Sequence, residues 1–130
     1  MNHRGTETQR DALSEQVIGC AIEVHRHLGP GLLEAVYEIC LCHELVEQGL
    51  KVQRQVPLPV KYKRVELEMG YRLDVVVENA MILEIKAASA INAVHEAQLL
   101  TYMRLSGHRR GLILNFHAPV LKDGIKRMVL

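Results

Sequence analysis

The sequence is poor in aromatic residues. It has no tryptophan, four tyrosines and a single phenylalanine, Phe116, among 130 residues. Proteins that bind single-stranded nucleic acid without sequence preference stack successive bases on several aromatic side chains. A stacking platform of that kind is therefore not expected from this composition.

Cysteine is also scarce, and its positions do not suggest cross-links. Cys20, Cys40 and Cys42 form an odd set, whereas a disulfide framework needs pairs. A zinc site made from these three would lack a fourth ligand and the usual paired spacing. We therefore expect three reduced thiols in a cytoplasmic protein.

The sequence lacks both an excess of charge of one sign and a long apolar run. Sixteen basic and fifteen acidic residues give a net charge of +1, so a nucleic-acid partner would have to be bound by a local patch. No segment approaches the roughly 18 apolar residues of a membrane span. Neither a membrane protein nor a secretory precursor is expected, and 48% hydrophobic with 24% charged residues is typical of a globular chain.

The sequence does contain an ordered series of helix and strand patterns. Residues 1–10 are polar and unpatterned, which predicts a flexible tail, and residues 11–130 fit one domain. The expected order is α-α-β-β-β-β-α-β-β, an α/β (α+β) domain with a mixed central sheet flanked by helices. Helices are predicted over 11–28, 33–48 and 92–106, and strands over 52–60, 65–69, 71–77, 81–86, 110–116 and 125–130.

Charged residues interrupt the hairpin of residues 71–86, which is otherwise apolar on both faces. A three-residue loop at 78–80 would pair Val77 with Met81 and therefore place Asp74 opposite Glu84, about 5 Å apart at Cβ. Lys86 would lie on the same face. Ionised groups in such strands are costly unless they are paired or bound to a cation.

Two opposed carboxylates and a lysine suggest metal-assisted chemistry. Magnesium prefers oxygen ligands, can lower the pKa of a bound water and can offset charge on a phosphodiester. Lys86 could orient that water or stabilise the developing charge. The pattern therefore suggests phosphodiester hydrolysis, and the alternative is a buried ion pair that only holds the hairpin together.

The same residues resemble a known superfamily. Asp74, followed ten residues later by Glu84-Ile85-Lys86, resembles the signature of PD-(D/E)XK nucleases, although Leu73 stands where the superfamily name has proline. Residues 31–37 resemble the motif that names the GxxExxY proteins, a family placed in that superfamily. Further blocks at 71–74, 98–102, 111–116 and 123–125 extend the resemblance over nearly the whole chain from residue 13 onward.

The resemblance implies a PD-(D/E)XK nuclease-like fold, Mg²⁺ or Mn²⁺ as cofactor, and a role for each site residue. It makes Asp74 and Glu84 metal ligands and Lys86 the catalytic lysine. Glu34 is implied to be an additional carboxylate that touches the metal directly or through water; its alternative role is to complement the dipole of a helix.

Two further residues are implied by the helix that follows the hairpin. Gln98 and Tyr102 match a Q-x-x-x-Y element, and their spacing puts both on one helix face that could point at the site. Tyr37, in the GxxExxY motif, and Tyr102 have the alternative of being core aromatics with one polar end.

Nucleic-acid contacts are weakly indicated. Arg72 and the basic run containing Lys61, Lys63 and Arg64 resemble phosphate-contacting residues, but a solvated turn explains the run equally well.

The function expected is a metal-dependent phosphodiesterase or nuclease that cleaves DNA by in-line attack of a metal-activated water, with RNA as an open alternative substrate. A rival hypothesis is a catalytically silent nucleic-acid-binding or adaptor protein that retains the fold. In a third hypothesis, a homodimer or a protein partner supplies the substrate contacts.

Overall fold

The computed structural model describes the backbone of residues 3–130 and the side chains from residue 12 onward. Helix α1 (His3–Leu28) begins earlier than the predicted start at residue 11. Residues 1 and 2 and the side chains of residues 3–11 lie outside the described part of the chain. The flexible tail predicted for residues 1–10 therefore stays a prediction. Every helix among the described residues is too short or too polar to cross a lipid bilayer.

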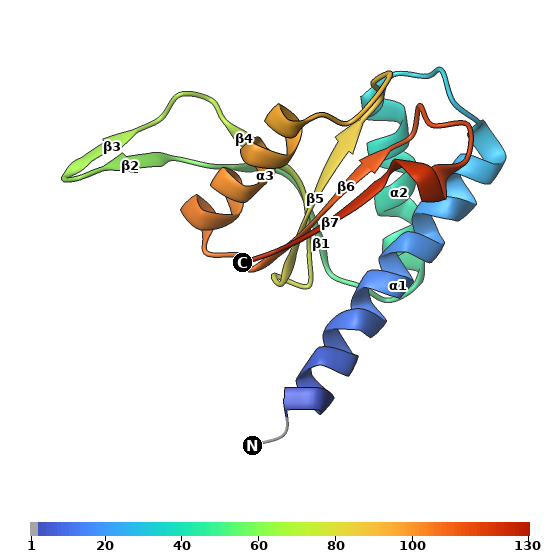
Figure 1. Cartoon of the computed structure of the whole chain (residues 1–130), viewed down its shortest axis with the longest axis horizontal. Coiled ribbons are helices and arrows are strands. Elements are labelled where there is room, and N and C mark those ends of the chain that lie inside the picture. The colour runs from blue at the N-terminus through green and yellow to red at the C-terminus, as the bar shows by residue number, and fades with distance from the viewer. Residues whose placement is uncertain (1–2) are drawn as a thin grey trace.

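A five-stranded mixed sheet forms the centre of the molecule, in the order β1-β4-β5-β6-β7 (Figure 1). Strands β5 and β6 are parallel and are joined through α3, while the other neighbours are antiparallel. Strand β1 lies at an edge of the sheet, where Pro57 is tolerated because proline cannot donate to a ladder. The strands are β1 (Val52–Pro57), β4 (Arg72–Val77), β5 (Met81–Lys86), β6 (Arg110–Asn115) and β7 (Ile125–Val129).

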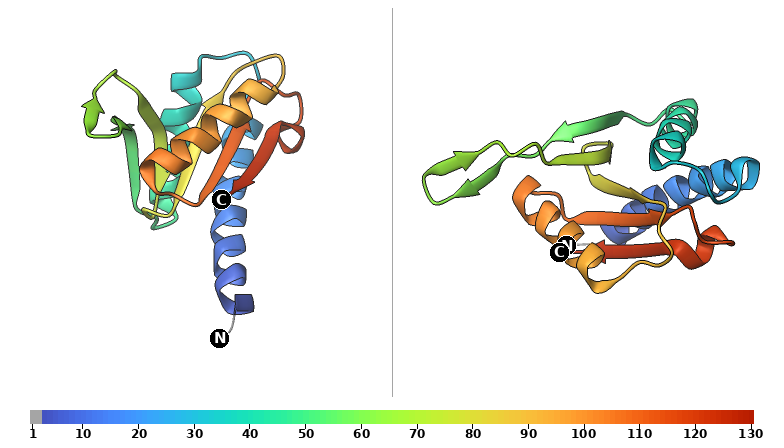
Figure 2. Two further views of the ribbon diagram at one scale, coloured as in Figure 1. Left: turned by 60° about the vertical axis from the view of Figure 1, so that its left-hand side comes forward. Right: turned by 90° about the horizontal axis from the view of Figure 1, so that it is seen from above.

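Helices cover both faces of this sheet, which confirms the predicted mixed sheet flanked by helices. Helices α1 and α2 (Glu34–Glu47) pack on one face and α3 (Ala93–Ser106) on the other (Figure 2). Strands β4 and β5 therefore contribute to two cores, as expected for a hairpin that is apolar on both sides. One core includes Val17, Tyr37, Leu41, Val75, Leu83 and Phe116, and the other includes Val76, Ile82, Leu99, Met103 and Ile113.

Helix α3 begins and ends at the residues that the sequence predicted. Asn92 Oδ1 accepts a hydrogen bond from the His95 amide at 3.1 Å, and Gly107 ends the helix with a φ of 79°. The helix approaches β6 closely at Gly111, where a Cβ would lie 3.0 Å from the sulfur of Met103. These features fix the helix that carries the Q-x-x-x-Y element.

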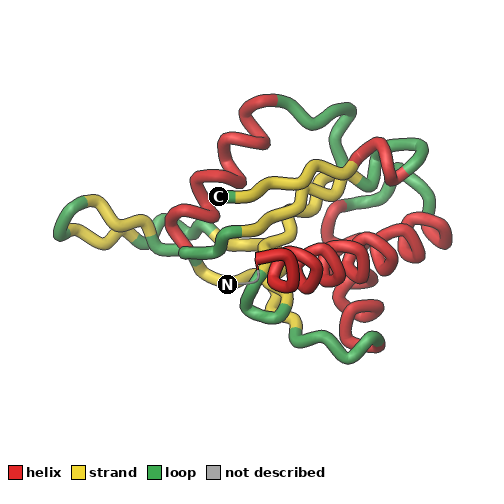
Figure 3. Tube along the Cα trace, turned by 60° about the horizontal axis from the view of Figure 1, so that its bottom comes forward, coloured by secondary structure: helices red, strands yellow, loops and turns green. Residues whose placement is uncertain are grey.

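A two-stranded ribbon, β2 (Val60–Tyr62) and β3 (Val65–Leu67), extends away from the sheet (Figures 1 and 3). The sequence predicted one strand over 52–60, whereas the structure ends β1 at Pro57 and begins β2 at Val60. Leu58 lies between them and is buried beneath α3. The ribbon therefore leaves the sheet at a proline-rich junction. A short 3-10 helix, η1 (Leu121–Gly124), precedes β7.

Candidate active site

The two carboxylates lie where β4 and β5 separate, at the end of the hairpin far from its turn. Val77 pairs with Met81, as predicted, and the pairing continues to Val75 and Leu83. Asp74 and Glu84 are the next residues beyond this last pair, and their side chains are close enough to interact. The ladder stops there, and Asp74 Oδ2 accepts a hydrogen bond from the Ile85 amide at 2.8 Å. The Asp74 side chain thus accepts a hydrogen bond from a backbone amide of β5. We call this point, where the two strands separate beside Asp74 and Glu84, the fork.

Glu84 is buried in this fork and incompletely satisfied. The residue is only 5% exposed, and the Oε1 atom of its side chain has no hydrogen-bond partner. Burial raises its pKa from the ordinary 4.5 to about 8, and the charge of Asp74 adds to the rise while Lys86 opposes it. A buried acceptor without a donor is costly, so this oxygen is suited to a proton or a cation.

Burial also raises the pKa of Asp74, against the lowering effect of the Ile85 hydrogen bond. The negative charges of Glu38 and Glu34 raise this pKa further, and the charge of Lys86 lowers it. Both carboxyl groups of the fork are therefore easier to protonate than ordinary carboxyls.

Lys86 stands at the end of β5, and its backbone is held from the next strand. It pairs with Asn115 of β6, and its carbonyl accepts a hydrogen bond from the Phe116 amide at 2.9 Å. The Asn115 side chain is bonded to both the amide and the carbonyl of Ala88. These hydrogen bonds hold the main chain in place immediately after the fork. The backbone that carries the long Lys86 side chain is therefore fixed, while its ammonium group can move.

Glu34, the first residue of α2, approaches the same strand end from the other direction. Its Oε2 accepts a hydrogen bond from the Ala87 amide at 3.2 Å. The structure therefore brings Glu34 to the end of β5 beside Lys86, although 50 or more residues separate them in the sequence. It also lies in the first turn of α2, so the dipole role remains compatible with this position.

Tyr37 anchors the loop that positions Glu34 and is fully buried. Its hydroxyl donates to the Gly29 carbonyl at 2.6 Å and accepts from the Leu32 amide at 3.0 Å. Its ring stacks on Phe116 with centroids 4.6 Å apart. Tyr37 thus matches the predicted alternative, a core aromatic with one polar end. Gly31 has a φ of 106°, which favours glycine, so both ends of the motif shape the turn before α2.

Gln98 and Tyr102 of α3 share one helix face, as their spacing predicted. Gln98 Nε2 donates to the Tyr102 hydroxyl at 3.2 Å. Burial raises the pKa of Tyr102, and the negative charges of Glu84 and Asp74 raise it further. The phenol is therefore on the side of α3 that faces the carboxylates. The fork lies between α2 and α3.

One buried acidic residue was missed by the sequence reasoning. Glu38, one turn after Glu34, is only 4% exposed. Its Oε2 accepts from Arg54 Nε at 2.7 Å, and Gln55 Nε2 bonds to both of its oxygens at 3.0 Å. Gln55 has a φ of 53° and interrupts the β1–β4 pairing at the level of Asp74. A signal was present, because Glu38 stands between Tyr37 and Leu41 in the buried stripe of α2.

The basic candidates are dispersed. Arg72 is exposed at the start of β4, where its Nη1 donates to the Gln55 carbonyl at 3.4 Å. Lys61, Lys63 and Arg64 lie on the β2–β3 ribbon, which extends away from the sheet (Figure 3). The structure does not bring this run together with the carboxylates.

The donor set of the fork fits a divalent ion, although it is not a closed metal cage. Among the residues with described side chains, no group of three His, Cys, Asp or Glu is arranged to hold a metal. The unpartnered Glu84 oxygen beside the Asp74 carboxylate nevertheless offers two ligands of the type that Mg²⁺ prefers. Magnesium sites commonly use one or two carboxylates and complete their shell with water, so this donor set is sufficient.

A family model described as the PD-(D/E)XK nuclease superfamily matches residues 11–128. Searches among curated proteins and among solved structures found no match. The narrower resemblance to GxxExxY proteins stays a prediction. The matched region includes the whole fork, both flanking helices and the central sheet except the last residue of β7. The chain belongs to the PD-(D/E)XK nuclease superfamily.

Proposed function

We propose that the protein is a Mg²⁺- or Mn²⁺-dependent nuclease that hydrolyses phosphodiester bonds of DNA at the β4–β5 fork. The single observation that carries the proposal is the buried Glu84 oxygen without a partner, placed beside Asp74 and followed by Lys86. Proteins of this superfamily generally use divalent metal ions.

In this proposal each residue of the fork has a distinct role. Asp74 and Glu84 would hold the ion, and Glu34 would contact it directly or through water. A divalent ion bound there supplies a water of lowered pKa and positive charge for the phosphodiester. The Lys86 ammonium would orient the attacking water or bind a phosphate oxygen, because lysine is a mobile donor and no magnesium ligand.

The helix α3 would complete the site from the opposite side. Gln98 and Tyr102 are joined by a hydrogen bond, so the phenol and the amide are held as one polar unit facing the carboxylates. Arg72 and the ribbon residues Lys61, Lys63 and Arg64 would contact phosphates away from the cleaved bond. Such contacts position a nucleic acid without reading its sequence.

A catalytically silent nucleic-acid-binding or adaptor protein is the second candidate, and one observation favours it. The raised pKa values of Asp74 and Glu84 support this candidate, because a proton could then satisfy the fork in place of a metal. The fold would then persist with the site protonated. Recruitment of DNA by a homodimer or a protein partner stays a prediction.

Cleavage assays distinguish these candidates. Purified protein is incubated with linear, nicked and single-stranded DNA, and with RNA, in Mg²⁺ or Mn²⁺. We expect metal-dependent cleavage that is lost in Asp74→Ala and retained in Glu47→Gln, which removes an exposed carboxylate at the end of α2. Wild-type cleavage no greater than that of Asp74→Ala on every substrate would favour the silent protein.

A further inference from the structure

A cavity of about 380 Å³ lies between the base of the ribbon and α3. This volume is within the range of pockets that bind small organic groups. Val60, Val94 and Leu105 form apolar walls, while Tyr71, Tyr102 and Gln98 contribute rings and polar atoms. None of the described residues that line it carries a charge, so the cavity suits a neutral, flat group better than a phosphate.

Tyr102 relates this cavity to the carboxylates of the fork. Gln98 and Tyr102 line the cavity, and Tyr102 is also the side chain on which the charges of Glu84 and Asp74 act. A ligand whose phosphate lies at the fork could therefore place an adjoining group against α3.

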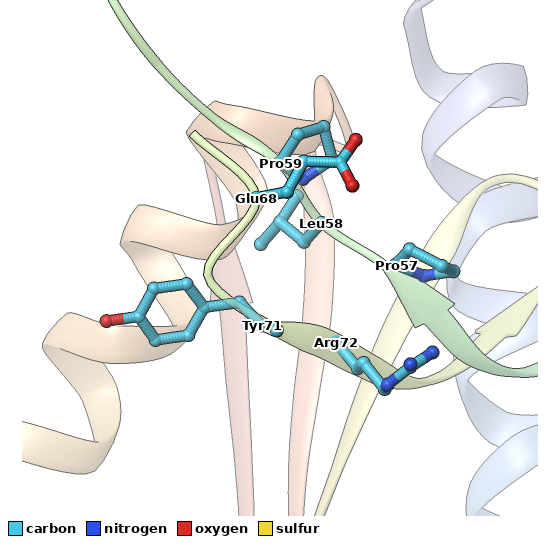
Figure 4. A pocket seen from close by; sticks show the side chains of 7 residues that line it. Pro57, Leu58, Pro59, Glu68, Tyr71 and Arg72 are labelled. Carbon is cyan, nitrogen blue, oxygen red and sulfur yellow. The ribbon is translucent and has the colours of Figure 1, made fainter. Parts of the chain in front are cut away.

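Two of the four tyrosines meet at this cavity, which the aromatic-poor composition did not suggest. The Tyr71 and Tyr102 ring centroids are 6.1 Å apart with an interplanar angle of 59°. Figure 4, a close-up of a second pocket that Tyr71 and Arg72 line, shows the Tyr71 ring directed toward α3 while Arg72 points to the other side. Tyr71 remains 46% exposed, so much of its surface is accessible to a ligand.

We propose that this cavity binds one unstacked nucleobase of the substrate, adjacent to the phosphate at the fork. The inference rests on the proposed function and names its substrate class: single-stranded DNA, or duplex DNA with an unpaired end. A base inside an intact duplex is stacked on both faces and cannot enter such a cavity without being extruded. Every base has a π face that can stack on a tyrosine ring, so the cavity accepts bases without strict sequence preference.

The polar atoms of the cavity suit the edge of a base. Gln98 uses one amide hydrogen for the Tyr102 hydroxyl, which leaves its carbonyl oxygen and its second N–H for a ligand. A donor and an acceptor on one amide match the mixed edges of nucleobases.

Binding of a labelled short single strand and of its blunt duplex, measured by fluorescence anisotropy, tests this inference. Ca²⁺ replaces Mg²⁺ in the assay because both ions take oxygen ligands. We expect Tyr71→Ala to weaken single-strand binding by about five- to 150-fold, the range for one base stacked on an aromatic ring. Tyr71→Phe, which keeps the ring, should bind the single strand as the wild type does. Neither substitution should change duplex binding.

A set of single strands, each with one abasic position, provides a second test. Wild-type affinity should fall at one position, and Tyr71→Ala should lose that dependence on position, because the two changes remove the same contact. Binding that does not depend on the abasic position, together with wild-type affinity in Tyr71→Ala, would overturn the base site while leaving the nuclease proposal intact.

Two other outcomes are distinguishable from this one. If wild-type protein neither binds nor cleaves any nucleic acid, the proposed function fails and the base site fails with it. If Tyr71→Ala converts a wild-type dimer into a monomer while single-strand binding is unchanged, the cavity is filled by a second copy of the chain, which also overturns the base site.

Discussion

The fork makes the metal-free protein less stable as the pH rises, and the mutation Glu84→Gln should remove much of this dependence. Burial and Asp74 raise the pKa of Glu84 from 4.5 to about 8 in the folded state. Below pH 4.5 the group is protonated in both the folded and the unfolded chain. Between the two pKa values only the unfolded chain releases the proton, so the free energy of unfolding falls as pH increases.

The size of the effect follows from the width of this window. Each pH unit within it costs 1.36 kcal/mol per proton. From pH 5 to pH 7 the wild type should therefore lose about 3 kcal/mol, a large share of the 5–15 kcal/mol typical of a folded domain. Over the whole window the loss attributable to Glu84 approaches about 5 kcal/mol, and above pH 8 it no longer grows.

The variant Glu84→Gln carries no titrating proton at this position, but its buried amide has its own cost of about 1–3 kcal/mol if unpaired. We therefore expect it to be less stable than the wild type at pH 5 and more stable at pH 8. Urea unfolding followed by circular dichroism is suitable, because the chain has no tryptophan to serve as a fluorescent probe. The experiment is done with a chelator present at pH 5, 6, 7 and 8.

Glu47→Gln serves as the matched control, since it removes an exposed carboxylate from the same molecule. It should follow the wild-type pH dependence. The reasoning is refuted if the wild type is equally stable across this range, or if Glu84→Gln loses stability as steeply as the wild type.

Three further predictions concern individual side chains. Lys86→Ala should abolish cleavage but keep Mg²⁺ binding in calorimetry, whereas Glu84→Ala should lose both; a Lys86→Ala protein that binds no metal contradicts the role of the lysine. Tyr37→Phe should lower the free energy of unfolding by about 1–3 kcal/mol, because the loop before α2 loses both hydrogen bonds of the Tyr37 hydroxyl; urea unfolding at wild-type stability would show that these bonds are dispensable. Glu38→Gln should lower the pKa of Asp74, because it removes a nearby negative charge. Carboxyl-carbon NMR titration measures this pKa, and an unchanged value would contradict the prediction.

The sequence was most informative where local rules determine the structure. The turn at 78–80 set the pairing of Val77 with Met81, and the carboxylates of Asp74 and Glu84 lie close enough to interact just beyond the last pair, Val75 with Leu83. The cap at Asn92 and the glycine at 107 bounded α3, which fixed the common face of the Q-x-x-x-Y pair. These features depend on residues close together in the chain, so a pattern could predict them.

Features that depend on distant segments could not be predicted in the same way. The bond between Glu38 and Arg54 forms only when α2 packs against β1, and the left-handed conformation of Gln55 has no signature in a non-glycine residue. The contact of Tyr71 with Tyr102 likewise requires the departure of the ribbon from the sheet. For the same reason, the sequence did not predict that the Tyr37 hydroxyl would bond to the backbone of Gly29 and Leu32 and so anchor the loop before α2.

The most direct test of the account is a crystal structure of the protein soaked in Mn²⁺ above pH 8, with anomalous scattering to locate the metal. The account predicts an anomalous peak between the carboxylates of Asp74 and Glu84, bonded to the Glu84 oxygen that lacks a partner. The Lys86 ammonium should lie beside the ion without binding it. A fork with no peak, in which the two carboxyl groups share a proton or pair only with Lys86, would contradict the claim that this is a metal-dependent active site.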